Sequence, residues 1–185
     1  MGMMLAFAPF LAFVVIERLV GAPVGLAAGA AVSAVLLLRD ALSTSRRVKV
    51  LEIGTFVLFG GLAVLALLPG HAPWSVAAVR LRVDTGLLIV VLASMVIGLP
   101  FSLQYARERV PAEQQRSAEF LRTNYVITAA WAAAFGVMVL ADLALTSMPA
   151  LPHGLPILAT VGAIVGALKF SGWYPQQGKA VATAG

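Results

Sequence analysis

Long apolar runs, each bounded by charged or turn-forming residues, follow one another along the whole chain. We identify six runs, at 4–20, 24–38, 51–68, 85–99, 123–146 and 157–170. A membrane-spanning helix needs about 20 apolar residues, with a range of about 17–25. The pattern therefore predicts an all-α protein, a polytopic membrane helix bundle with six transmembrane helices. The first two runs are short, so the sequence leaves open whether they cross the bilayer fully.

The connection between the fourth and fifth runs is the most polar part of the chain. Pro100 ends the fourth run, and the residues after it can form a short helix anchored in the membrane interface by Phe101 and Tyr105. Pro111 at a first helical position, with Glu113 close behind, favours a second short helix. We therefore expect an interfacial helical connection between helices four and five.

The composition supports a membrane location. Hydrophobic residues make up 61% of the chain and charged residues 11%, against about 45–50% and about 25% in soluble proteins. The apolar runs nearly use up the 185 residues, so we expect a single membrane domain over 1–175 and a flexible C-terminal tail over 176–185. The N-terminal run lacks the basic segment and cleavage site of a signal peptide, which favours a retained first span.

The distribution of positive charge predicts an orientation, because Lys and Arg collect in short cytoplasmic loops. If the gaps at 39–50 and 101–122 share a side with the tail, the other side holds three of the 13 basic residues, Arg18, Arg80 and Arg82. The first side then holds Arg39, Arg46, Arg47, Lys49, Arg107, Arg109, Arg116, Arg122, Lys169 and Lys179. Both termini are therefore expected on the cytoplasmic side.

The sequence offers little for catalysis or cofactor binding. A net charge of +5 spread over short gaps suits topology and lipid headgroups rather than nucleic acid. The absence of cysteine removes thiolate nucleophiles and thiolate metal sites. The two histidines, His71 and His153, fall in separate loops without carboxylate neighbours. We therefore expect no catalytic residue, no metal and no cofactor.

The positions of the eight carboxylates argue against ion-coupled transport. An ionisable group at the bilayer centre costs about 2.5–3.5 kcal/mol on insertion scales and usually marks function. All eight carboxylates fall near the ends of runs or in loops. Glu17 comes nearest to the membrane interior, and we expect it to form a structural charge pair with Arg80 or Arg82.

Small residues recur every four positions in two of the runs. Gly25, Gly29 and Ser33 do so in the second run, and Gly162 and Gly166 in the sixth. Such spacing lets helix backbones approach closely. The spacing has two possible explanations: packing of helices within one chain, or association of several copies of the chain.

Candidate binding residues gather at the predicted inner surface. Asn124 opens the fifth run one helical turn before Thr128, so both side chains lie on one face. We expect Gln104, Arg107 and Glu108 of the polar connection at the same location. These five residues are candidates for a binding surface or the mouth of a cavity, and a solvated connector is the alternative.

Several stretches together resemble the intracellular septation protein A family, also called the YciB family. They are LAFAPFLAFVV at 5–15, TFVLFGGLAVL at 55–65, Pro100 followed by Gln104, Glu108 and Pro111, and Asn124 followed by WAAAF at 131–135. The resemblance implies a bacterial inner-membrane protein that serves envelope maintenance and septation through partners in the cell-wall elongation and division machinery. It implies no catalytic residue.

Three functional hypotheses follow. The leading one is a non-enzymatic membrane protein whose inner face, formed by 39–52 and 100–124, binds anionic lipids or a protein partner. The second is a channel or transporter for a neutral or lipid-like substrate, with Gln104, Asn124 and Thr128 lining a polar cavity. The third, a membrane enzyme using Glu108 and Arg107, is disfavoured because adjacent residues on a helix point apart.

Overall fold

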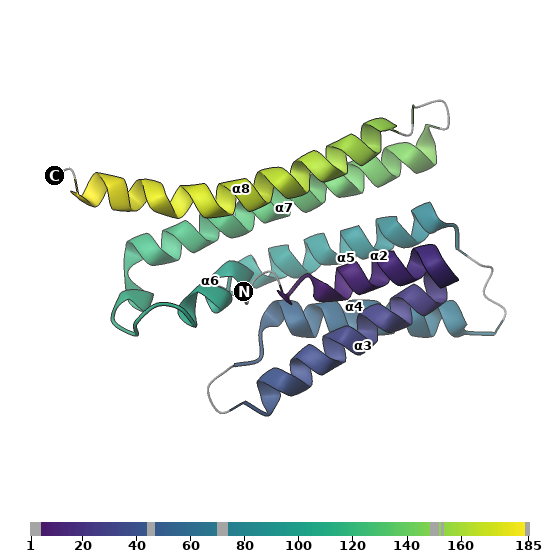
Figure 1. Ribbon diagram of the computed structural model, residues 1–185, viewed down its shortest axis with the longest axis horizontal. Coiled ribbons are helices and arrows are strands. Elements are labelled where there is room, and N and C mark those ends of the chain that lie inside the picture. The colour runs from purple at the N-terminus through teal and green to yellow at the C-terminus, as the bar shows by residue number, and fades with distance from the viewer. Residues whose placement is uncertain (1–4, 44–46, 70–73, 149–151, 153, 184–185) are drawn as a thin grey trace. The chain divides into compact units, whose positions relative to one another are not determined.

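A computed structural model describes residues 5–43, 47–69, 74–148, 152 and 154–183, with side chains described as far as residue 176. Within these ranges the chain forms helices and no strand, which confirms the all-α prediction (Figure 1). The tail predicted from 176 falls almost wholly outside the described side chains. The helices are α2 (Ala8–Val20), α3 (Ala22–Ala41), α4 (Val50–Leu67), α5 (Val76–Val96), α6 (Phe101–Arg107), α7 (Ala118–Ser147) and α8 (Gly154–Thr183), with a 3-10 turn at Gln114–Arg116.

Four of these helices, α3, α4, α7 and α8, are long and apolar enough to cross a membrane. The pair α5 and α6, bent by 68° at a short break, can count as a fifth span. Helix α2 has 13 residues, which at 1.5 Å per residue reach about 20 Å of a hydrocarbon core about 30 Å thick. The helices thus indicate a multi-pass membrane protein with four or five spans by this criterion, fewer than the six predicted.

The chain forms two compact units, Met1–Val90 and Val91–Gly185. The first unit contains α2, α3, α4 and most of α5. Its buried core takes one or two side chains from each of these helices, because each helix turns one apolar face inward. The core residues are Phe13, Leu26, Phe59, Ala63, Val79 and Val83.

Helices α2 and α3 form a tight hairpin whose close approach depends on Gly25. A Cβ atom added there would lie 2.9 Å from the backbone nitrogen of Glu17 and 3.0 Å from the carbonyl oxygen of Phe13. One turn later, Gly29 makes room for the ring of Phe59 from α4. Gly25, Gly29 and Ser33 are all buried. The repeat of small residues in α3 therefore serves packing inside the first unit.

A Schellman motif ends α5 and turns the chain into α6. The backbone N–H of Leu99 donates to the carbonyl of Ser94, and that of Gly98 donates to the carbonyl of Met95. Gly98 has a φ of +76°, a left-handed conformation that favours glycine. Phe101 then donates its N–H to the Ser94 hydroxyl over 3.2 Å. These bonds produce the bend before α6 at the place where the sequence predicts the fourth run to end.

The second unit is built on the antiparallel pair α7 and α8, with α6 packed on α7. The side chain of Trp131 in α7 donates to the Ser171 hydroxyl of α8 over 3.0 Å, and its ring meets that of Phe101 edge-on at 6.4 Å. The second short helix predicted from Pro111 is only the 3-10 turn, because α7 already begins at Ala118. The Ser117 hydroxyl caps that start by accepting from the Phe120 N–H.

Candidate functional site

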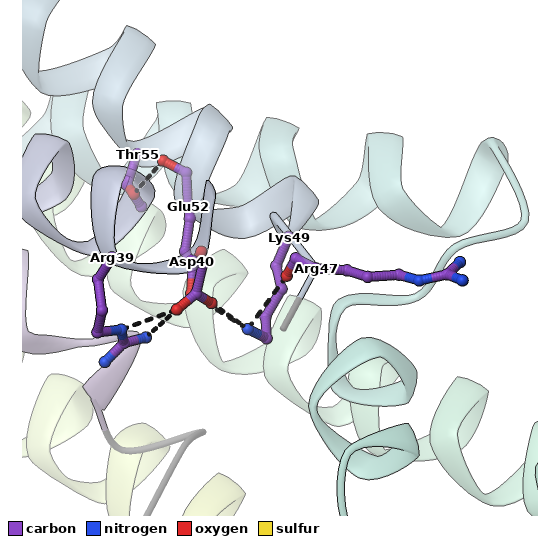
Figure 2. Close-up of polar contacts among 6 residues, drawn as sticks. All are labelled: Arg39, Asp40, Arg47, Lys49, Glu52 and Thr55. Carbon is purple, nitrogen blue, oxygen red and sulfur yellow. Dashed lines mark hydrogen bonds and ion pairs between the residues drawn. The ribbon is translucent and has the colours of Figure 1, made fainter. Parts of the chain in front are cut away.

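A buried cluster of charges joins the end of α3 to the start of α4 (Figure 2). Asp40 lies in the last turn of α3, Lys49 precedes α4, and Glu52 lies in the first turn of α4. Since the two helices are antiparallel neighbours joined by a short loop, these residues meet at one end of the pair. We call Arg39, Asp40, Lys49 and Glu52 the charge clasp.

The charge clasp alternates positive and negative groups at short distances. The Lys49 ammonium lies 2.5 Å from one Asp40 carboxylate oxygen and 3.6 Å from Glu52. The Arg39 guanidinium lies 2.7 Å from the other Asp40 oxygen. The side chains of Asp40, Lys49 and Glu52 are 0%, 4% and 3% exposed. Asp40, Lys49 and Glu52 thus lie where water scarcely reaches, while the Arg39 side chain at the edge of the charge clasp is 34% exposed.

Sequence reasoning missed the charge clasp because it assigned Asp40 to a loop and treated Glu52 alone. The available signal was the run RD at 39–40 facing VKVLE at 48–52 across a short connection. Opposite charges at facing ends of two antiparallel helices meet when the loop between them is short. The clasp can fix the α3–α4 hairpin, and Lys49 also donates to the Arg47 carbonyl over 3.4 Å.

A second polar cluster, Ser102, Asn124 and Thr128, holds α6 against α7. The Ser102 hydroxyl donates to the Asn124 backbone carbonyl over 2.8 Å and lies 2.9 Å from the Thr128 hydroxyl. The Asn124 side-chain amide donates to the Phe120 carbonyl over 2.8 Å. The exposed fractions of Ser102, Asn124 and Thr128 are 3%, 3% and 0%. Asn124 and Thr128 do share a face, and that face is closed by Ser102, which sequence reasoning did not single out.

The other three candidate residues, Gln104, Arg107 and Glu108, lie in α6 and directly after it, outside the cluster of Ser102, Asn124 and Thr128. Gln104 donates its side-chain amide to the Leu99 carbonyl over 2.8 Å. It comes two residues after Ser102, so the two side chains leave α6 in different directions. Arg107 is the last residue of α6, and the exposed Glu108 follows as its C-terminal cap.

The loop after α6 is held by the side chain of Gln115. The Gln115 side chain donates to the carbonyls of Arg107 and Val110 over 3.0 and 2.8 Å. These two hydrogen bonds link the 3-10 turn to the end of α6. The exposed charged side chains of the connection and of the first turns of α7 are Glu108, Arg109, Glu113, Arg116, Glu119 and Arg122.

The expected charge pair at Glu17 involves Arg80. Glu17 is 5% exposed, and its carboxylate lies 3.6 Å from the Arg80 guanidinium. Arg82 instead stacks on the Trp74 ring at 4.5 Å and donates to the Ala78 carbonyl over 2.7 Å. The structure therefore brings Glu17 and Arg80 together and gives Arg82 an aromatic partner.

Metal-binding geometry is not found in the described part of the chain, where no three His, Asp or Glu residues converge. His71 and His153 lie outside the described residues. No family model, curated protein or solved structure matches this chain. The function therefore has to be argued from the geometry of the two polar clusters and the exposed connection.

Replacing Ser102 by alanine is expected to lower the free energy of unfolding by about 1–2 kcal/mol, because two hydrogen bonds at about 1 kcal/mol each are lost inside the protein. Unfolding by SDS in mixed detergent micelles measures this change. The pair Ser102→Ala and Thr128→Val should cost less together than the sum of the single changes, since both remove one shared contact.

Thr123→Val is the matched control, because the Thr123 hydroxyl makes no hydrogen bond with the described residues. It should leave the unfolding free energy nearly unchanged. Strict additivity of Ser102→Ala and Thr128→Val would show that their hydroxyls do not interact.

Proposed function

We propose that this chain is a non-enzymatic, multi-pass protein of the bacterial inner membrane that acts by binding envelope or division proteins, or anionic lipids, at its cytoplasmic face. The proposed topology has six spans with both termini cytoplasmic, α2 being a short first span and the α5–α6 pair the fourth. The connection between α6 and α7 is then an interfacial element on the cytoplasmic side, as its arginine content favours.

One observation carries the proposal: the polar side chains of the two buried clusters bond to one another, while the α6–α7 connection and the start of α7 expose their charges. Asn124 and Thr128 are closed against Ser102, and Asp40 and Lys49 neutralise each other in the charge clasp. The exposed side chains at 108–122 alternate in sign. An exposed surface of alternating charges suits recognition of a protein or a lipid headgroup, since electrostatic complementarity gives specificity.

The alternative hypothesis, a channel or transporter for a neutral or lipid-like substrate, needs Asn124 and Thr128 to face a polar cavity. Their side chains are 3% and 0% exposed and hold α6 to α7, which favours a structural role for both. The resemblance of the sequence to the intracellular septation protein A family supports a place in envelope maintenance and septation. Neither the burial of Asn124 and Thr128 nor the family resemblance requires a catalytic group.

The proposal is tested by deleting the gene in its bacterial host and complementing it. We expect the deletion to lengthen cells and disturb septa, and the wild-type gene to restore both. The variant Arg109→Gln, Arg116→Gln, Arg122→Gln should fail to restore them at normal protein levels, because three exposed charges of the connection are lost. Cell length and septum position, scored by microscopy, are the readout.

The control is Arg18→Gln, since Arg18 is also exposed but lies on the opposite predicted side of the membrane. It should complement fully. Full complementation by the triple variant would contradict a role for the connection, and substrate flux in vesicles containing the pure protein would favour the transporter.

A further inference from the structure

A groove of about 300 Å³ lies between α7 and α8, the two helices that run side by side in the second unit (Figure 1). Both helices qualify as membrane spans. The lining has no charged or hydrogen-bonding side chain and consists mostly of alanine and glycine. It comprises Ala130, Ala133, Ala134, Val137, Gly162, Ala163, Gly166, Ala167 and Phe170.

The groove is open space rather than a helix contact. A Cβ atom added at Gly162 or at Gly166 would meet nothing within 4 Å, whereas one added at Gly25 would strike the backbone of α2. The groove is open to its surroundings and both of its helices qualify as membrane spans, so in a bilayer it is filled by hydrocarbon, and a segment of an acyl chain has the right chemistry.

One charged residue stands at the edge of this groove. Lys169 is the single Asp, Glu, Lys or Arg between 154 and 176. It follows Gly166 by three residues and Gly162 by seven, so it lies on the same face of α8. It is exposed and makes no ion pair with the residues that the structure describes. A lysine inside a span extends its long side chain toward the interface and favours an anionic partner there.

Aromatic residues mark the level of the headgroups just beyond the groove. Trp173, four residues after Lys169 and 54% exposed, lies with its ring 6.0 Å from that of Phe170. Tyr174 stacks on Phe170 at 5.2 Å. Trp and Tyr collect at membrane interfaces. The apolar groove is thus followed along α8 by a cation and then by aromatic residues, so that the extended Lys169 side chain reaches the level where Trp and Tyr collect and where lipid phosphates lie.

We propose that the α7–α8 groove binds one acyl chain of an anionic phospholipid whose phosphate is held by Lys169. This site lies outside the α6–α7 connection and does not depend on the function proposed above. A second copy of the chain is a poorer occupant, because a two-fold contact through the groove would bring two copies of Lys169 together. Like charges brought together at a desolvated contact are costly.

The test measures lipid retention by native mass spectrometry of the protein in mild detergent, titrated with phosphatidylglycerol or with phosphatidylcholine of the same acyl chains. The wild-type protein should bind phosphatidylglycerol more tightly. Lys169→Gln should weaken phosphatidylglycerol binding about fivefold, the effect of one basic residue near an anionic headgroup, and leave phosphatidylcholine binding unchanged. Lys169→Arg should keep the preference.

Gly166→Leu fills the groove and should weaken the binding of both lipids by a similar factor. Ala133→Leu, on the α7 wall, is the second filling variant in case Gly166→Leu does not fold. Gly172→Leu is the matched control, because an added Cβ there also meets nothing within 4 Å and residue 172 is not part of the groove lining.

Equal binding of the two lipids by the wild-type protein would overturn the role of Lys169. Unchanged binding in both filling variants would overturn the groove as the site. A wild-type dimer that Gly166→Leu converts into a monomer, with lipid binding intact, would assign the groove to a second copy instead. None of these results depends on whether the arginine variants of the α6–α7 connection complement the gene deletion.

Discussion

Lys49→Met is expected to lower the free energy of unfolding by about 3–5 kcal/mol, the cost of breaking a buried ion pair by removing one partner. The Lys49 ammonium is the group that lies between Asp40 and Glu52, at 2.5 and 3.6 Å. Without it, two carboxylates that are 0% and 3% exposed lose the cation between them, and Arg39 is the remaining cation of the charge clasp. Methionine keeps the length of the side chain, so the loss is one of charge rather than volume.

The experiment is SDS unfolding in mixed micelles, followed by circular dichroism. Arg47→Met is the matched control: Arg47 belongs to the same loop, is exposed, and its side chain extends away from the charge clasp (Figure 2). It should change the unfolding free energy by less than about 0.5 kcal/mol, as surface substitutions usually do. If Lys49→Met were as mild as Arg47→Met, the clasp would not stabilise the α3–α4 hairpin.

A double-mutant cycle separates the pair from its surroundings. Asp40→Asn combined with Lys49→Met should be less destabilising than the sum of the two single changes, because the double variant no longer leaves Asp40 charged and without Lys49. A coupling energy of at least about 1 kcal/mol is expected for residues in one ion network. A coupling near zero would mean that Asp40 is balanced by Arg39 alone.

Gly25→Leu is expected to destabilise the protein by about 3 kcal/mol, at the upper end of what overpacking costs. A Cβ atom at this position already lies 2.9 Å from the backbone nitrogen of Glu17, and backbone cannot move aside as a side chain can. Helices α2 and α3 would have to separate along their whole contact. This would disturb the core around Phe13 and Leu26 and the approach of Arg80 to Glu17.

Gly61→Leu in α4 is the matched control, because an added Cβ there meets nothing within 4 Å. Removing a glycine from a helix interior is favourable by up to about 1 kcal/mol, so this variant should be neutral or slightly more stable. The same SDS titration compares the two variants. Equal stability of both would show that α2 and α3 are not in the close contact described.

Much of the local structure could be predicted from the sequence. The run at 51–68 corresponds to α4, and Pro100 with the glycine before it marks the end of α5 and the start of α6. These features depend on neighbouring residues: an apolar run of sufficient length forms a helix in a bilayer because its backbone groups must bond internally. The number of spans could not be predicted from neighbouring residues alone, because α2 is short and α5 and α6 are separated by a bend of 68°.

The candidate residues could be chosen from the sequence, but not their partners. Asn124 and Thr128 were placed on one face by helical spacing alone, and this holds for any helix. That Ser102 would close this face depends on α6 folding back on α7, a contact between residues more than 20 positions apart. Gln104, two positions from Ser102, was the more conspicuous residue, yet it donates to Leu99.

The sequence by itself determined that this is a helical membrane protein, because chain length and hydropathy decide which segments a bilayer accepts. Only the tertiary structure decided what the small residues do. Gly25 and Gly166 stand in the same four-residue spacing, yet Gly25 is pressed against the backbone of α2 while Gly166 lines an open groove. Spacing states which residues share a helix face, and only the packing of the helices states what that face meets.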